Sequence, residues 1–191
     1  MPLLKDYHTS EDYWNLPEEK RAELINGKFY NMAPPSRIHQ KLVSKLTALF
    51  NQYITDHHGS CEVYPAPFAV NLDADDKDWV EPDISVICDP NKLTDRGCSG
   101  APDLIFEIVS PASRKMDYGL KNTIYSQAGV REYWIVDPIR ESVIVYRQDD
   151  DGVPVLHKFG ERIRVVMPGW SLWTVISVCS SPFRATSAPL I

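Results

Sequence analysis

The fold is decided between residues 81 and 121, where the sequence reads EPDISVI (81–87), DLIFEIVSP (103–111) and DYGLK (117–121). The first two segments are short apolar runs bounded by Pro and polar residues, a pattern typical of strands buried on both faces. Each run carries a carboxylate, Asp83 in the first and Glu107 in the second. Because an unpaired buried carboxylate costs several kcal/mol, two of them in neighbouring strands predict a shared positive charge. A divalent cation would supply it.

Side chains alternate between the two faces of a strand, so Asp83 shares a face with Ser85, and Glu107 shares one with Val109. If the two strands are neighbours with these faces aligned, the carboxylates meet at one place. Lys121 follows on a predicted helix, one turn after Asp117. Such a helix packs back over the sheet, so Lys121 is placed to reach the carboxylate pair.

Two amphipathic helices are expected. The first runs from residue 37 to about residue 55, is capped by Ser36 and carries His39 in its first turn, because its apolar residues recur every three or four positions. The second follows Pro111, has an apolar residue at every fourth position from 116 to 128, and ends at Gly129.

The remaining pattern predicts strands. Residues 23–30 (ELINGKFY) indicate a hairpin, because Asn-Gly between apolar runs favours a tight primed turn. Residues 61–72 predict a strand interrupted by two prolines, which is expected at a sheet edge or with a bulge. Residues 132–138 predict a strand, with 142–146 antiparallel to it, and residues 155–158 with 162–166 predict a further hairpin.

Length and composition favour one α/β domain over residues 1–179, with residues 180–191, rich in Ser and Pro, as a poorly ordered tail. No apolar stretch is long enough to cross a bilayer, and no basic region followed by an apolar one opens the sequence, so a cytoplasmic protein is expected. The net charge of -6 is the wrong sign for a general nucleic-acid binder. A bound cation would restore local attraction for phosphate.

The four cysteines are widely scattered, and their spacing predicts free thiols in a reducing compartment. An alternative is a zinc site built from Cys88, Cys98 and the pair His57-His58. The spacing argues against it, because no two cysteines have the short gap that is typical of zinc ligands.

Several segments together resemble the PD-(D/E)XK nuclease superfamily and, within it, the Uma-type family of bacterial restriction endonucleases. The likeness spans roughly residues 12–169. It is carried by ELING (23–27), His39, EPD (81–83), FEIVSP (106–111), Asp117 with Lys121, and GVREYWIVDP (129–138).

The resemblance implies a restriction-endonuclease-like mixed β-sheet flanked by helices, nuclease chemistry and a Mg²⁺ site, for which Mn²⁺ can substitute. It places Asp83 and Glu107 as metal ligands, and Glu23 and His39 at further motif positions of the same cleft. In the superfamily motif a Lys stands two residues after the second acidic residue. That acidic residue is Glu107 in this chain, and the position of the Lys is taken by Val109. We therefore expect Lys121 to supply the ammonium group from the neighbouring helix.

These residues imply a Mg²⁺-dependent endonuclease acting on double-stranded DNA as a homodimer, because cutting both strands commonly uses two copies of a site. Simpler interpretations compete. Asp83 could cap a turn, and Glu107 could form a structural ion pair. Lys121 could form an ion pair with Asp117 on the surface of the helix. His39 could merely begin its helix, and Glu23 could be solvated.

Two other functions remain open at this stage. One is a catalytically silent binding or assembly module that keeps the scaffold, favoured by Val109 at the usual Lys position and by the acidic net charge. The other is a metal-dependent hydrolase of RNA or of a small phosphate ester.

Overall fold

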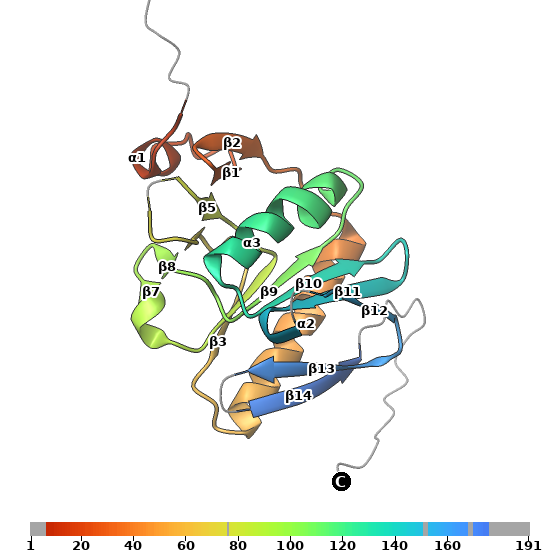
Figure 1. Ribbon diagram of the computed structural model, residues 1–191. Coiled ribbons are helices and arrows are strands. Elements are labelled where there is room, and N and C mark those ends of the chain that lie inside the picture. Colours follow the sequence, from red (N-terminus) through yellow and green to blue (C-terminus); the bar gives the residue numbers. More distant parts are fainter. Residues whose placement is uncertain (1–6, 76, 151–152, 168–169, 176–191) are drawn as a thin grey trace, which may run out of the picture.

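A six-stranded sheet lies at the centre of the computed structural model, which describes residues 7–75, 77–150, 153–167 and 170–175 (Figure 1). The strand order is β12-β11-β10-β9-β6-β3. The strands are β3 (Glu62–Pro65), β6 (Ile84–Ile87), β9 (Leu104–Ile108), β10 (Glu132–Asp137), β11 (Ser142–Arg147) and β12 (Val155–Lys158). β9 and β10 are parallel and the other neighbours antiparallel, so the predicted mixed sheet is confirmed.

The two strands at the heart of the prediction are adjacent. Every residue of β6 and β9 is buried, as expected for continuous apolar runs. They are antiparallel, and Ile84 lies opposite Phe106. β3, which ends at Pro65, forms the edge of the sheet, as its proline content predicted. The prediction of a single strand over residues 61–72 is wrong, because Val70 and Asn71 belong to β4, which lies inside a second sheet.

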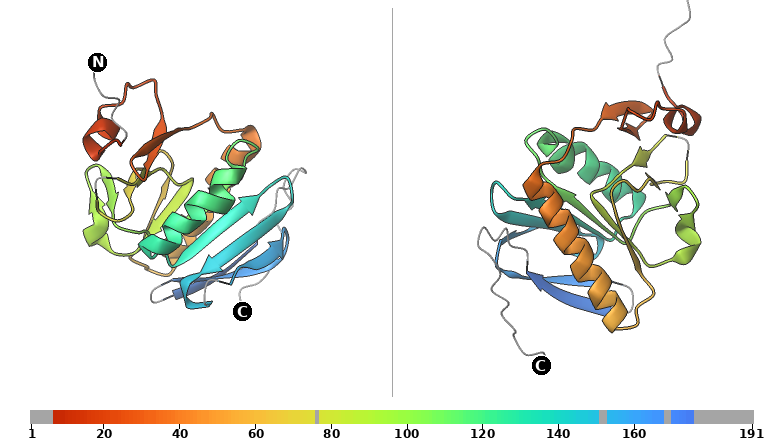
Figure 2. Two further views of the ribbon diagram at one scale, coloured as in Figure 1. Left: turned by 45° about the horizontal axis from the view of Figure 1, so that its top comes forward. Right: turned by 180° about the vertical axis from the view of Figure 1, so that it is seen from behind.

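Helices cover both faces of this sheet. α2 (Arg37–Asp56) lies on one face, and η2 (Met116–Lys121) with α3 (Asn122–Ala128) lies on the other (Figure 2). The predicted cap of α2 is confirmed, because the Ser36 side chain accepts a hydrogen bond from the backbone N–H of His39. Under α2 the core contains Phe50, Phe106 and Trp134, all fully buried. Burial of each such side chain contributes about 1.5 to 3 kcal/mol.

The second predicted helix is present but is not a regular α-helix along its whole length. Arg114 and Lys115 are α-helical, η2 is a π-helical segment, and α3 continues from it without a break. The helix ends at Gly129, whose φ of 85° lies in the left-handed region that glycine adopts without strain. Ile124 and Tyr125 bury the inner side of α3 against the sheet.

A smaller six-stranded sheet lies beside the central one, with the order β2-β1-β5-β4-β8-β7. Its strands are β1 (Ala22–Ile25), β2 (Lys28–Asn31), β4 (Val70–Asn71), β5 (Trp79–Val80), β7 (Leu93–Thr94) and β8 (Gly97–Ser99). The β1–β2 hairpin is confirmed, and its turn residues Asn26 and Gly27 both have positive φ, as a primed turn requires. The short helices are α1 (Ser10–Trp14), η1 (Pro90–Lys92) and η3 (Gln148–Asp150).

The predicted hairpin of residues 155–158 with 162–166 is wrong. β12 pairs with β11 and extends the central sheet, whereas β13 (Arg162–Met167) pairs with β14 (Trp170–Val175) in a separate two-stranded sheet. β13 alternates exposed and buried residues and packs Ile163, Val165 and Met167 into the core under α2. The predicted tail, residues 180–191, lies outside the described residues.

The cysteine prediction also needs correction. Cys61, just before β3, forms a disulfide with Cys88, just after β6, because the antiparallel pairing of these strands brings their ends together. Cys98 is a buried free thiol, as predicted, and Cys179 is outside the described residues. Within the described residues, no helix has the length and apolar character needed to cross a membrane.

Candidate active site

A cavity of about 180 Å³ lies where β6, β9, the start of α2, the β1–β2 hairpin and η2 meet. All five residues singled out from the sequence line it, namely Glu23, His39, Asp83, Glu107 and Lys121. They come from five separate segments of the chain, so the fold brings together residues that the sequence keeps far apart.

Asp83 and Glu107 meet as the strand faces predicted. The register that places Ile84 opposite Phe106 continues one residue further to place Asp83 beside Glu107. The Asp83 Oδ2 accepts a hydrogen bond of 2.7 Å from the backbone N–H of Ile108, next to Glu107. Asp83 therefore ties the two strands together, and the interpretation of this residue as a simple turn cap is wrong.

Lys121 is buried and belongs to the carboxylate cluster. Its Nζ lies 2.9 Å from Glu107 Oε1 and 2.8 Å from Glu23 Oε1. Only 5% of Lys121 is exposed, so the alternative of a surface pair with Asp117 is wrong. Burial alone would lower the pKa of Lys121, but the Glu107 and Glu23 carboxylates raise it well above its usual value. Lys121 is therefore a protonated hydrogen-bond donor.

Glu23 and His39 hold positions on either side of this pair. Glu23 is buried, which rules out a solvated hairpin residue, and its Oε1 also accepts a hydrogen bond from the backbone N–H of Glu81. His39 Nε2 lies 3.0 Å from Asp83 Oδ2, and its Nδ1 is buried without a partner among the described residues. His39 thus does more than begin α2, because it contacts the first candidate ligand.

The sequence interpretation missed two residues of the site. Tyr125 donates a hydrogen bond of 2.7 Å to Glu107 Oε1. Asp117 lines the cavity, is 1% exposed, and accepts a hydrogen bond of 2.6 Å from the Ser113 hydroxyl. Their signal was present, because Asp117, Lys121 and Tyr125 recur at four-residue steps beside the apolar stripe of the helix.

The π-helical segment η2 contains Asp117 and Lys121, and both are buried. A π-helical turn has i to i+5 hydrogen bonds and so accommodates one more residue than an α-helical turn, and such turns occur often at functional sites. The local geometry of this part of the site could not be expected from the apolar periodicity.

Negative charge is in excess around the cavity. Five carboxylates line it, those of Glu23, Glu81, Asp83, Glu107 and Asp117, against two cationic side chains, those of Lys121 and Arg21. Burial and the neighbouring carboxylates raise the pKa of Glu107 well above its usual range, although Lys121 opposes this shift. Burial is also the main cause that raises the pKa of Asp117 to about 6. A cation in the cavity would relieve this repulsion.

The donor set fits a hard cation such as Mg²⁺. Glu107 receives both of its hydrogen bonds at Oε1, and Asp83 receives its contacts at Oδ2. In the described part of the chain, the second oxygen of each has no hydrogen-bond partner, and Asp117 Oδ1 is buried without one. Mg²⁺ is typically held by one or two carboxylates, with water and phosphate oxygens as further ligands.

The described residues contain no group of three or more His, Cys, Asp and Glu side chains arranged to hold a metal. The protein would therefore supply only the two carboxylates, and water or substrate would complete the coordination. The zinc alternative is wrong, because Cys88 is in a disulfide and these residues form no such group.

Two sequence comparisons found relatives of this chain. Residues 4–177 match the Uma2 family, which is described as "Putative restriction endonuclease". An uncharacterised protein of Synechocystis sp. is 26% identical over 145 residues, which cover 74% of this chain and 75% of that protein.

The fold has a counterpart among solved structures. A crystal structure described as that of "a putative nuclease" from Anabaena variabilis superposes with a TM-score of 0.66 and 23% identity, and the match covers 84% of this chain and 89% of the other. The restriction-endonuclease-like fold expected from the sequence is thereby confirmed, and the chain belongs to the Uma2 family of restriction-endonuclease-like proteins.

Proposed function

We propose that this protein is a Mg²⁺-dependent endonuclease that hydrolyses phosphodiester bonds of double-stranded DNA. The observation that carries the proposal is the convergence of Asp83 and Glu107 from adjacent strands on one cavity, with Lys121 Nζ 2.9 Å from Glu107 Oε1. Membership of the Uma2 family, described as "Putative restriction endonuclease", supports the nuclease class. Mg²⁺, with Mn²⁺ as a substitute, and a homodimer that cuts both strands belong to the same proposal.

In this proposal Asp83 and Glu107 hold the metal through Oδ1 and Oε2, the oxygens that accept no hydrogen bond from the described residues. When bound, Mg²⁺ would polarise a phosphoryl oxygen and lower the pKa of a coordinated water. Lys121 stays protonated between two carboxylates, so it acts as a hydrogen-bond donor that orients the attacking water or stabilises the negative charge that develops on phosphate.

The other residues position these groups. Glu23 lies 2.8 Å from the Lys121 ammonium, and Tyr125 donates to Oε1 of Glu107, which orients this carboxylate. His39 contacts Oδ2 of Asp83 and keeps that carboxylate in a single orientation. Mutation of a group that orients a metal ligand typically lowers metal affinity or activity by about 10- to 100-fold.

The test is cleavage of supercoiled plasmid with Mg²⁺ or Mn²⁺ by the wild type and by Asp83→Ala and Glu107→Ala. Both variants should lose metal-dependent cleavage and keep the wild-type circular dichroism spectrum. Asp73→Ala, which removes an exposed carboxylate outside the cavity, is the matched control and should cleave normally. Unchanged cleavage by either cavity variant would remove the assignment. Single-stranded DNA, RNA and a chromogenic diester distinguish the substrate classes.

A second candidate is a catalytically silent module. It is favoured by Val109 at the superfamily Lys position and by the ion pair that already occupies one oxygen of Glu107. Calorimetric titration with Mg²⁺ separates the two, since a silent scaffold has no need of metal. Heat of binding that disappears in Asp83→Ala would favour the enzyme.

A further inference from the structure

A second cluster of charged residues lies around Asp137, the last residue of β10. Asp137 is 1% exposed, and its Oδ2 lies 2.8 Å from Arg114 and accepts a hydrogen bond of 3.0 Å from Tyr118. Its Oδ1 accepts hydrogen bonds from the backbone N–H groups of Ile139 and Arg140. Although burial by itself raises the pKa of Asp137, these donors hold it below its usual value. Both carboxylate oxygens of Asp137 therefore have hydrogen-bond or ion-pair partners.

More cationic side chains lie around Asp137 than its single carboxylate can neutralise. Arg114 already neutralises the carboxylate, whereas the Arg140 side chain lies 3.9 Å away and is 63% exposed. Lys115 is exposed and forms no ion pair with any described residue. The guanidinium groups of Arg114 and Arg140 lie 5.8 and 5.9 Å from the centre of the Tyr118 ring, which fixes both near one aromatic surface. Three positive charges therefore face one negative charge.

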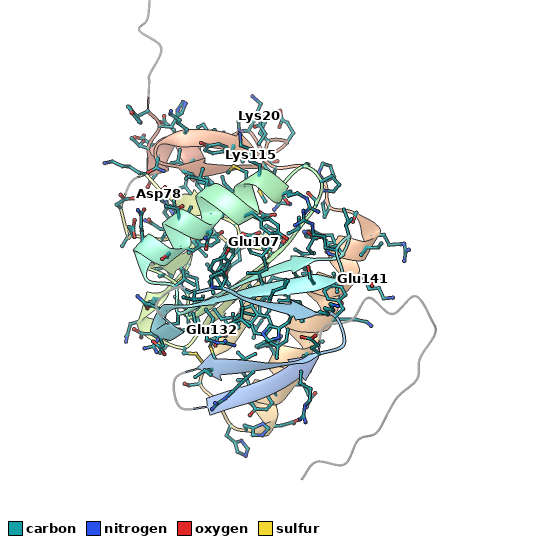
Figure 3. All side chains as sticks on the ribbon, turned by 45° about the vertical axis from the view of Figure 1, so that its right-hand side comes forward. Lys20, Asp78, Glu107, Lys115, Glu132 and Glu141 are labelled. Carbon is teal, nitrogen blue, oxygen red and sulfur yellow. A yellow bond between two sulfur atoms is a disulfide. The ribbon has the colours of Figure 1, made fainter. Side chains whose placement is uncertain are left out.

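These side chains form one surface next to the catalytic cavity. Arg114, Lys115, Tyr118 and Arg140 line a second cavity of about 550 Å³. Ala112 lines both this cavity and the catalytic one, so the two adjoin along the segment that follows β9. The Lys115 side chain lies near the start of the helix that covers Glu107 (Figure 3).

We propose that Arg114, Lys115, Arg140 and Tyr118 form a docking surface for the backbone phosphates of the DNA duplex beside the bond that is cut. The proposal rests on the proposed nuclease function and adds to it where the substrate lies. A chain with a net charge of -6 needs a local excess of cations to hold a polyanion. Guanidinium groups ordered by a buried carboxylate and a ring are suited to phosphate oxygens. Such contacts position the duplex without reading its sequence.

The experiment compares two arginines at opposite ends of β10. Arg140 follows the end of the strand and is 63% exposed, whereas Arg131 precedes its start and is 56% exposed, and each lies near one aspartate. Binding of the full-length chain to a fluorescent duplex is measured in EDTA, over a series of salt concentrations, for the wild type, Arg140→Gln and Arg131→Gln. EDTA prevents metal-dependent cleavage during the titration.

Arg140→Gln should bind roughly five- to tenfold more weakly at low salt, and the slope of log K against log salt should shrink by about 0.9, the value for one lost phosphate contact. Adding Lys115→Gln should shrink the slope again. Arg131→Gln should match the wild type. In cleavage assays with Mg²⁺, Arg140→Gln should raise KM and leave kcat unchanged.

Equal affinity and slope for Arg140→Gln and Arg131→Gln would overturn the docking surface, as would the absence of duplex binding by the wild type. The first result would leave the catalytic proposal intact, because cleavage by the wild type and by Asp83→Ala is judged separately. Preference for an RNA duplex over DNA, with the same loss in Arg140→Gln, would keep the surface and overturn its assignment to DNA.

Discussion

Two glutamates buried in neighbouring parallel strands have opposite surroundings. Glu107 on β9 is 4% exposed, and Glu132 on β10 is 2% exposed. Glu132 uses both oxygens: Oε1 accepts from Arg147 and from the backbone N–H of Val166, and Oε2 accepts from Trp134. Glu107 accepts two hydrogen bonds at Oε1 and none from the described residues at Oε2.

The difference distinguishes a structural carboxylate from a candidate catalytic one. Figure 3 shows Glu107 beside the helix over the sheet and Glu132 near the other end of the strands. Glu132 ties β10 to β11 and β13 and is fully compensated, as a buried charge must be to be tolerated. Glu107 instead lines a cavity, and the proposed function assigns its second oxygen to the metal.

The largest expected effect is at Glu107. Glu107→Gln should reduce Mg²⁺-dependent cleavage on the order of a thousandfold, because the amide cannot serve as an anionic metal ligand. Its melting temperature should stay near that of the wild type, since the amide oxygen can still accept from Lys121 and Tyr125. Plasmid cleavage and thermal melts measure the two effects, and full activity of this variant would contradict the assigned role of Glu107.

Glu132→Gln should show the reverse behaviour. Gln has a single acceptor oxygen, so its NH2 group would face a donor that Glu132 now satisfies, and the attraction to the Arg147 guanidinium would weaken; the free energy of unfolding should fall by about 3 kcal/mol. Cleavage per folded molecule should remain within a few-fold of the wild type. Urea denaturation measures the stability. A stable but inactive Glu132→Gln would erase the distinction between the two glutamates.

Asp117 is a third buried carboxylate and, like Glu107, keeps one oxygen unpartnered. The pKa of Asp117 is about 4 in the unfolded state and about 6 in the folded state, so between these pH values the folded protein keeps a proton on Asp117 that the unfolded chain has lost. The unfolded state therefore binds fewer protons in this window, and wild-type stability falls as pH rises through it. Asp117→Asn should be more stable than the wild type by roughly 3 kcal/mol at pH 8, and the gain should vanish near pH 4.

The measurement for Asp117→Asn is urea denaturation in EDTA at pH 4, 6 and 8. Ser113→Ala, which removes the donor to Asp117 but keeps the carboxylate, is the companion variant. A gain in stability that does not change with pH would show that Asp117 is not protonated in the folded protein below pH 6.

The smallest effect is expected from Tyr125→Phe, which removes one donor to Glu107 Oε1 and leaves Lys121 in place. Stability should fall by about 1 kcal/mol, and cleavage should fall by about tenfold because the ligand is less well oriented. Tyr133→Phe is the control, since its hydroxyl donates to the backbone carbonyl of Asp117 and not to Glu107. Equal losses of cleavage in both variants would remove the positioning role of Tyr125.

Patterns formed by residues close together in the sequence predicted the positions of helices and strands well. Alternation and apolar runs located β6 and β9, the step of three or four residues located α2, and Asn26-Gly27 located the first hairpin. Such patterns depend on neighbours a few positions apart, and those neighbours are fixed by the geometry of a strand or helix. The same local reasoning failed for β12 and β13, because strand pairing depends on which partner is nearby in space.

Some residues of the candidate site could also be predicted from the sequence. Apolar strands that each carry one acid drew attention to Asp83 and Glu107, because buried charge needs compensation. The disulfide of Cys61 with Cys88 and the pair of Glu23 with Lys121 were not predictable, since the cysteines are 27 positions apart in the sequence and no periodicity links such positions.

By itself the sequence determined the buried strands, the two long helices and the positions of the acids within them. Only the tertiary structure decided which carboxylate oxygens find donors, because those donors come from distant segments: Tyr125 lies 18 positions from Glu107, and Val166 lies 34 from Glu132. Hydrogen bonds act over about 3 Å in space whatever the separation along the chain. Two glutamates on neighbouring strands therefore differ after folding: Glu132 has donors at both oxygens, whereas Glu107 has donors from the described residues at one, and we propose that its second oxygen binds the metal.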